Sequence, residues 1–194
     1  MLPLVVAEAD REIVARQLGR EPRTLRRIAL RCPFGAPAVT EQSPYTSDGE
    51  PFPTTYYLTC RHLVAAVSRL EAAGGVERWS AVVRGDADLG ASLAAADDEQ
   101  RRVRRELAAG TTGTDGGASL DYGVAGSRQS GSLKCLHAHV AFALARPGYE
   151  LGERILAEID PRWPEGRCCS APRSGRGRAA TSAPGPAPSS LRRP

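Results

Sequence analysis

The sequence has very little lysine and no long apolar run. Lys134 is the only lysine, and the other 25 of the 26 basic residues are arginine. With abundant alanine and glycine, this bias is typical of a G+C-rich genome, so runs of arginine carry little functional information. The longest apolar stretches, around Leu63–Val67 and Ala138–Ala145, are far too short to span a bilayer. No basic export leader precedes Glu8, so we expect a cytoplasmic protein with no membrane contact.

The usual signatures of catalysis are also missing. The sequence has no nucleophile elbow, no His-Glu-x-x-His motif, no dinucleotide fingerprint and no kinase motif set. Five cysteines are present, and no Cys-x-x-Cys pair occurs among residues 1–162. In a cytoplasmic protein these cysteines should be reduced thiols or metal ligands rather than a disulfide framework. The sequence therefore does not state which reaction, if any, the protein performs.

The positive charge of the chain is concentrated at its C-terminal end. Residues 163–194 hold six arginines and one acidic residue, Glu165, and so carry +5, whereas residues 1–162 carry −1. A nearly neutral core argues against nucleic acid as its partner. After Trp163 the composition becomes Gly, Ala, Ser, Pro and Arg, which cannot bury enough apolar surface to fold. We predict one domain over 1–162 and a disordered tail over 163–194 that binds anions weakly and nonspecifically, with Cys168-Cys169 incidental.

Hydrophobic periodicity and turn residues divide the first 162 residues into short elements. Residues 43–53 are expected to form a loop, and residues 110–131 lack periodicity, which indicates a mobile or functional segment. Strands are predicted over 25–32, 38–42 and 54–59, and helices over 4–18, 61–73, 76–84, 87–108, 133–145 and 151–159. This pattern predicts an α+β fold, in which a small antiparallel sheet of about three strands is packed by five or six helices.

Each of the three histidines closely follows a cysteine. The motifs are Cys60-Arg61-His62 and Cys135-Leu136-His137-Ala138-His139, and Cys32 is the last residue of a predicted strand. Thiolate and imidazole are preferred ligands of zinc and related metals. The leading hypothesis is therefore a zinc or iron site made of Cys32, Cys60, Cys135 and either His137 or His139. If Cys135 lies in the first helical turn, it shares a face with His139 rather than with His137. Buried thiols beside ordinary histidines are the simpler alternative.

A second candidate site is the Gly/Ser-rich segment that precedes the helix predicted from Leu133. Small residues before a helix N-terminus favour anion binding, and Arg128, Ser130, Ser132 and Lys134 could contribute. The spacing does not match a P-loop, and a connector with Ser132 as the helix N-cap is the simpler interpretation. The corresponding function would be an enzyme for a phosphorylated or other anionic small molecule, with Lys134, Cys135 and His137 as catalytic candidates. A non-catalytic interaction module is the third alternative.

Four motifs, in order along the chain, resemble one known family. They are Arg31-Cys32-Pro33, Asp48-Gly49-Glu50-Pro51-Phe52-Pro53-Thr54, Tyr56-Tyr57-Leu58-Thr59-Cys60 and Lys134-Cys135-Leu136-His137. Together they resemble the bacterial family called domain of unknown function 501, over roughly residues 10–160. The resemblance implies an actinobacterial origin and places Cys32, Cys60, Cys135 and His137 within family motifs, but it implies no activity. Arg61 and the segment 146–152 depart from the family pattern.

Overall fold

The computed structural model describes residues 6–128 and 133–171 and is built around a three-stranded antiparallel sheet. The strands are β1 (Leu25–Arg31), β2 (Pro37–Gln42) and β3 (Tyr56–Leu58), and β2 pairs with both neighbours. The register places Leu30 opposite Val39 and Val39 opposite Leu58. Every residue of β2 is buried, as expected for a central strand covered on both faces.

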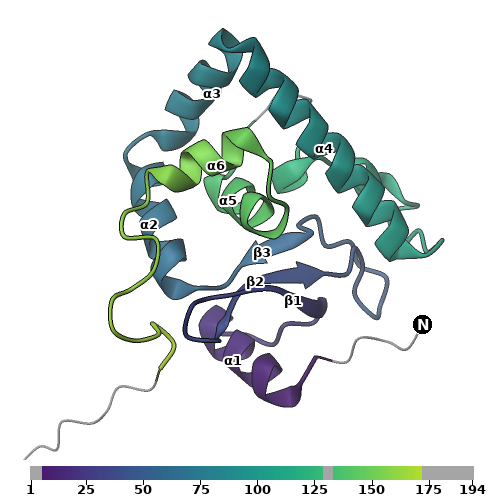
Figure 1. Cartoon of the computed structure of the whole chain (residues 1–194). Coiled ribbons are helices and arrows are strands. Elements are labelled where there is room, and N and C mark those ends of the chain that lie inside the picture. The colour runs from purple at the N-terminus through teal and green to yellow at the C-terminus, as the bar shows by residue number, and fades with distance from the viewer. Residues whose placement is uncertain (1–5, 129–132, 172–194) are drawn as a thin grey trace, which may run out of the picture.

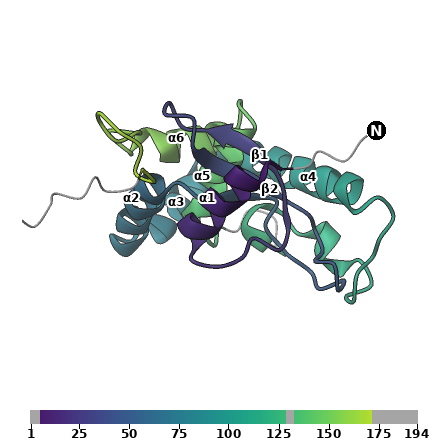
Figure 2. The ribbon, with the colours of Figure 1, turned by 90° about the horizontal axis from the view of Figure 1, so that it is seen from below.

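Six α-helices surround the sheet in the part of the chain that the structure describes. Helix α1 lies on one side of the sheet, and α5 and α6 lie on the other, with α4 passing along the far side of the helical layer (Figure 1; the view from below is in Figure 2). Their bounds are α1 Glu8–Leu18, α2 Arg61–Ala72, α3 Gly75–Gly85, α4 Ala87–Ala108, α5 Leu136–Ala145 and α6 Glu150–Ala157. Together with the sheet, they confirm the predicted α+β class.

Local chemistry explains several of the helix ends. Gly19 has φ of 70° and ends α1 in the left-handed conformation that glycine adopts without strain. Asp86 caps α4, because its carboxylate accepts hydrogen bonds from the backbone N–H groups of Asp88 and Leu89. Gly74, with φ of 78°, separates α2 from α3. The stop at Gly74-Gly75 is thus a change of direction between two helices.

Helix α5 is the centre of the hydrophobic core. Its sequence is apolar on all sides, and it contacts all three strands as well as α2 and α6. Phe142 packs edge-on against Tyr56 of β3, with ring centroids 5.6 Å apart, and against Tyr149, with centroids 5.5 Å apart. A helix that is hydrophobic all round must be covered on every side, which explains why the other helices are arranged around α5.

The core extends beyond residue 162, where the composition predicts that the fold ends. Trp163, Cys168 and Cys169 pack against the hydrophobic core, and the Gln17 side chain donates a hydrogen bond to Ser170. These contacts correct the predicted domain boundary for residues 163–171. Residues 172–194 lie outside the described part of the chain. Among the described residues, no helix combines the length and apolarity needed to cross a membrane.

Candidate metal site

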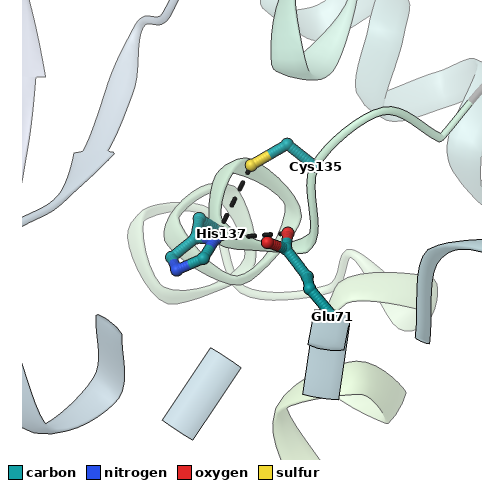
Figure 3. Close-up of side chains that lie close together, drawn as sticks. All are labelled: Glu71, Cys135 and His137. Atoms are coloured by element: carbon teal, nitrogen blue, oxygen red, sulfur yellow. Dashed lines mark hydrogen bonds and ion pairs between the residues drawn. The ribbon is translucent and has the colours of Figure 1, made fainter. Parts of the chain in front are cut away.

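A thiol, an imidazole and a carboxylate meet where the end of α2 faces the start of α5. In the described part of the chain, Glu71, Cys135 and His137 form the one group of three such donors whose ligand atoms all lie within 4.8 Å of one another. The Cys135 Sγ lies 3.7 Å from His137 Nδ1, and that nitrogen lies 3.2 Å from Glu71 Oε1 (Figure 3). The Glu71 and His137 side chains are 26% and 24% exposed, so the group is shielded yet reachable.

The backbone around Cys135 explains why its sulfur turns toward His137. Cys135 is not in the first helical turn, as the sequence suggested, but is the extended N-cap residue before α5. The predicted pairing of Cys135 with His139 at i, i+4 is therefore wrong, because that spacing brings side chains together only when both residues are helical. His137, in the first turn, is the histidine that contacts the thiol.

Helix α2 supplies the other partners of His137. The His137 Nε2 lies 3.2 Å from the Val64 carbonyl oxygen and 3.2 Å from Ser68 Oγ. Val64, Ser68 and Glu71 are spaced by four and three residues, so they share one face of α2. A carbonyl can only accept a hydrogen bond, so the neutral ring carries its proton on Nε2 and leaves the Nδ1 lone pair facing Cys135 and Glu71.

The electrostatics of the group favour a cation at Nδ1. The Cys135 sulfur, as hydrogen-bond partner, raises the pKa of His137 to about 9; burial opposes this effect and the Glu71 carboxylate adds to it. Glu71 also accepts a hydrogen bond of 2.6 Å from the backbone N–H of Leu136, so the carboxylate is oriented by the start of α5. A proton therefore occupies the space between the three donors in the metal-free protein.

A pocket of about 390 Å³ opens beside this group. It is lined by residues of β3 and α2 that include Tyr56, Tyr57 and Arg61, and by Cys135 and His137 themselves. Arg61 adds a permanent positive charge to the lining and also donates a hydrogen bond to the Arg16 carbonyl. The thiol and the imidazole are thus accessible to a small molecule.

The other proposed ligands lie elsewhere. Among the described residues, no group of three donors within 4.8 Å of one another includes Cys32, Cys60 or His139. The Cys32 sulfur faces Cys168, and the Cys60 sulfur faces Cys169. His139 is completely buried, and its Nδ1 lies 2.7 Å from the Tyr149 hydroxyl.

The residues proposed for anion binding are partly described. Arg128 donates two hydrogen bonds to the Tyr122 hydroxyl, and its guanidinium lies 5.0 Å from the centre of the same ring. The Lys134 Nζ lies 3.2 Å from the Gly126 carbonyl oxygen. Ser130 and Ser132 lie outside the described residues. Both described cations therefore already have partners within the protein.

Glu71 is the member of the group that sequence reasoning missed. It belongs to an ordinary amphipathic helix that ends at Gly74-Gly75, and nothing in its neighbourhood distinguishes it from a solvated glutamate. Its proximity to His137 depends on the packing of α2 against α5, which sequence spacing does not show.

Comparison with known families identifies the family of the chain. A family model described as "Protein of unknown function (DUF501)" matches residues 28–157, which is well over half of the chain. The chain therefore belongs to this family. Glu71, Cys135 and His137 lie within the matched range, whereas Cys168 and Cys169 lie beyond it. Comparison with curated proteins found no match. Comparison with solved structures also found none.

Proposed function

We propose that this protein binds a divalent transition metal, zinc or iron, through Glu71, Cys135 and His137, and offers the metal to the adjacent pocket. The observation that carries the proposal is the convergence of sulfur, nitrogen and oxygen donors on one point. Donor atoms around a tetrahedral zinc ion lie about 3.3–3.6 Å apart. The separations of 3.7 Å and 3.2 Å at His137 Nδ1 need only small adjustments to match that geometry.

The hydrogen bond on the far side of His137 supports the same interpretation. Metal-binding histidines usually donate their other ring N–H to a carbonyl or carboxylate, which fixes the tautomer and the ring orientation. The Val64 carbonyl stands in this position beside His137 Nε2. The ring is thus held with its lone pair directed at the thiol and the carboxylate.

Three protein donors favour a reactive site over a purely structural one. A tetrahedral ion held by three side chains keeps one position for water or a small ligand, as in catalytic zinc sites. Such an ion lowers the pKa of bound water or polarises a carbonyl or phosphoryl oxygen. Arg61 in the pocket favours an anionic small molecule as the substrate. The free state of all five cysteines supports placing this activity in the cytoplasm.

The geometry supports metal binding better than a thiol-based catalytic triad. In such a triad, one imidazole nitrogen takes the proton of the nucleophile and the other nitrogen is oriented by the carboxylate. Here the Cys135 sulfur and the Glu71 carboxylate both face Nδ1, and Nε2 faces the Val64 carbonyl. Because the thiol and the carboxylate both face Nδ1, the ring cannot take the thiol proton on one nitrogen while the carboxylate orients it through the other.

Metal analysis of the full-length, untagged protein tests the proposal. We expect about one equivalent of zinc or iron per chain, and a thiolate-to-metal absorption band when cobalt is substituted. Cys135→Ser and His137→Gln should each lose the metal. Glu71→Gln should weaken binding while it keeps an oxygen to accept the Leu136 N–H.

The matched control is His62→Gln, which alters a histidine that instead hydrogen-bonds with the Pro161 carbonyl and should leave the metal content unchanged. Less than about a tenth of an equivalent of metal in the parent protein would contradict the proposal. So would an unchanged cobalt spectrum in Cys135→Ser.

A further inference from the structure

Two pairs of cysteines lie outside the candidate metal site. Cys168 and Cys169 are adjacent in the chain, yet each faces a different cysteine of the core. The Cys168 and Cys32 sulfurs are 3.9 Å apart, and the Cys169 and Cys60 sulfurs are 3.6 Å apart. A single pair of neighbouring thiols could be coincidental, but two pairs in register show that the C-terminal segment is placed along the ends of β1 and β3.

Other contacts hold this segment in the same position. The Pro161 carbonyl oxygen lies 2.8 Å from His62 Nε2 on α2. Gln17 of α1 donates one hydrogen bond to the Ser170 hydroxyl and another to the Pro37 carbonyl of β2. The segment from Pro161 to Ser170 is therefore fixed at both ends, and the approach of the sulfurs does not depend on the cysteines alone.

The surroundings of Cys60 and Cys169 give the two thiols different reactivity. Cys60 is the N-cap residue of α2 and is 2% exposed, and burial raises the pKa of its thiol to about 12. Burial alone would also raise the pKa of Cys169, but the backbone N–H of His62, the Cys60 thiol and the N–H of Arg61 lower it below its usual value. Because the N–H groups of His62 and Arg61 belong to the first turn of α2, the Cys169 sulfur lies at a helix N-terminus. Thiolates in that position are reactive, so Cys169 is the nucleophile of the pair.

We propose that Cys60 and Cys169 form a redox-active thiol pair that a low-molecular-weight disulfide converts into an intramolecular disulfide. The Cys169 thiolate attacks one sulfur of the reagent, forms a mixed disulfide and releases one thiolate. Cys60 then passes its proton to a released thiolate and attacks the Cys169 sulfur, which expels the second thiolate. Two protein thiols are oxidised, and one reagent disulfide is reduced to two thiols.

The geometry requires little movement for this reaction. A disulfide bond is about 2.05 Å long, so the two sulfurs must approach each other by about 1.5 Å, which is within the reach of side-chain rotation. A four-thiolate metal site fits less well, because no three cysteine sulfurs in the described segments lie within 4.8 Å of one another. The four sulfurs lie in two separate pairs, which is the arrangement that disulfide formation requires.

The product would lock the C-terminal segment onto the N-terminus of α2. Arg61, the first residue of α2, also lines the pocket beside Cys135. Oxidation therefore fixes the edge of that pocket without involving any of the three metal-site residues. The reaction needs no metal, so it is tested in the presence of a chelator and stands independently of the proposed function.

The experiment treats the reduced full-length protein with oxidised glutathione, blocks free thiols with an alkylating reagent and maps the peptides. Trypsin releases Cys32 and Cys60 together in residues 32–61, and Cys168 and Cys169 together in residues 168–173. A second cut after Glu41 separates Cys32 from Cys60. We expect the peptide that contains Cys60 to be joined to residues 168–173.

Two neighbouring variants identify the partner. Cys168→Ser should keep the link to Cys60, and Cys169→Ser should abolish it. Circular dichroism before oxidation checks that both variants are folded. In the reduced parent protein, Cys169 should also be alkylated faster than Cys60. A disulfide between Cys168 and Cys169, a link to Cys60 that persists in Cys169→Ser, or glutathione that remains on Cys169 in the parent would each overturn the proposal.

Discussion

At the residue scale, His139 shows how completely burial can change an ionisable side chain. Its ring is fully buried, its Nδ1 contacts the Tyr149 hydroxyl, and its Nε2 has no hydrogen-bond partner among the described residues. Burial lowers the pKa of His139 to about 4, against about 6.5 in an unfolded chain. Protonation therefore favours unfolding.

The expected consequence is a loss of stability in mild acid. Above pH 6.5 the ring is neutral in both states and contributes no pH dependence. Between pH 6.5 and 4 only the unfolded chain binds the proton, so the free energy of unfolding should fall with pH by up to about 1.4 kcal/mol per pH unit. Urea titrations of the metal-free protein across this window measure the slope. His139→Gln should flatten it, and His62→Gln should not.

His137 and Asp97 also have shifted pKa values, but their contributions to the pH dependence of stability can be distinguished from that of His139. The raised pKa of His137 acts above pH 6.5, where its contribution to stability is lost as the pH rises through about 9. Burial raises the pKa of Asp97, so the folded state binds this proton more readily and the contribution of Asp97 to stability increases as the pH falls. Because both groups are present in the parent and in His139→Gln, the difference between the two slopes isolates His139. Equal slopes would contradict the assignment.

At the element scale, Gly152 sets how closely α6 approaches α5. A Cβ added at this position would lie 2.7 Å from the Ala143 Cβ and 2.8 Å from the His139 carbonyl oxygen. Real side chains do not approach so closely, and backbone atoms cannot simply move aside. We expect Gly152→Ala to lower the free energy of unfolding by about 1–3 kcal/mol, measured by chemical denaturation.

Gly90 of α4 is the matched control for Gly152. Its Cβ would meet only the Val83 carbonyl oxygen, at 3.7 Å, which is an ordinary contact. Alanine has the higher helix propensity, so Gly90→Ala should stabilise the protein by about 0.5–1 kcal/mol. If both variants were stabilised, the result would contradict the close approach of α6 to α5 at Gly152.

Helix α4 shows what sequence patterns can and cannot predict. Hydrophobic periodicity and turn residues predict a helix over 87–108, and the structure has α4 with the same bounds. What these patterns do not show is that Asp97, Gln100 and Arg104 are buried together on one face of the helix. Asp97 accepts a hydrogen bond from the Val124 N–H, and Gln100 donates one to the Gly123 carbonyl. Polar residues at helical spacing look the same in a sequence whether they face water or a buried loop.

The same limit applied to the candidate site. Cys135 and His137 were identifiable because thiol and imidazole side chains are rare in this chain and adjoin each other. Glu71 lies 64 residues before Cys135, and many other glutamates resemble it. The composition around Cys168 and Cys169 favours disorder and so predicts that these cysteines are incidental, yet both pack against the core together with Trp163. Composition describes a segment by itself and does not show which surface that segment meets.

At the scale of the whole molecule, Arg104 joins three distant segments. It is 1% exposed, its Nε donates to the Ser119 carbonyl, and its Nη1 donates to the Phe52 carbonyl, both at 2.9 Å. Lysine has one ammonium group and cannot reach two carbonyls in this fork geometry. We expect Arg104→Lys to destabilise the fold by about 2–4 kcal/mol in thermal or chemical unfolding.

Arg102 provides the comparison on the same helix. Its ion pairs with Glu99 and Glu106 are exposed, so Arg102→Lys should change stability by less than about 0.5 kcal/mol. Hydrogen exchange should also show faster exchange around Ser119 in Arg104→Lys alone. Equal stability of the two variants would show that Arg104 does not join these segments.

The central position of α5 has a consequence for synthesis on the ribosome. The three strands are complete once residue 58 has been made, but the helix that covers them begins only at residue 136. A nascent chain that ends within α4 therefore carries a sheet whose apolar face has no cover, and loop closure over such separations is slow. The chain must protect that face until α5 emerges, so we expect its demand for chaperones to be greatest while residues 59–145 are being translated.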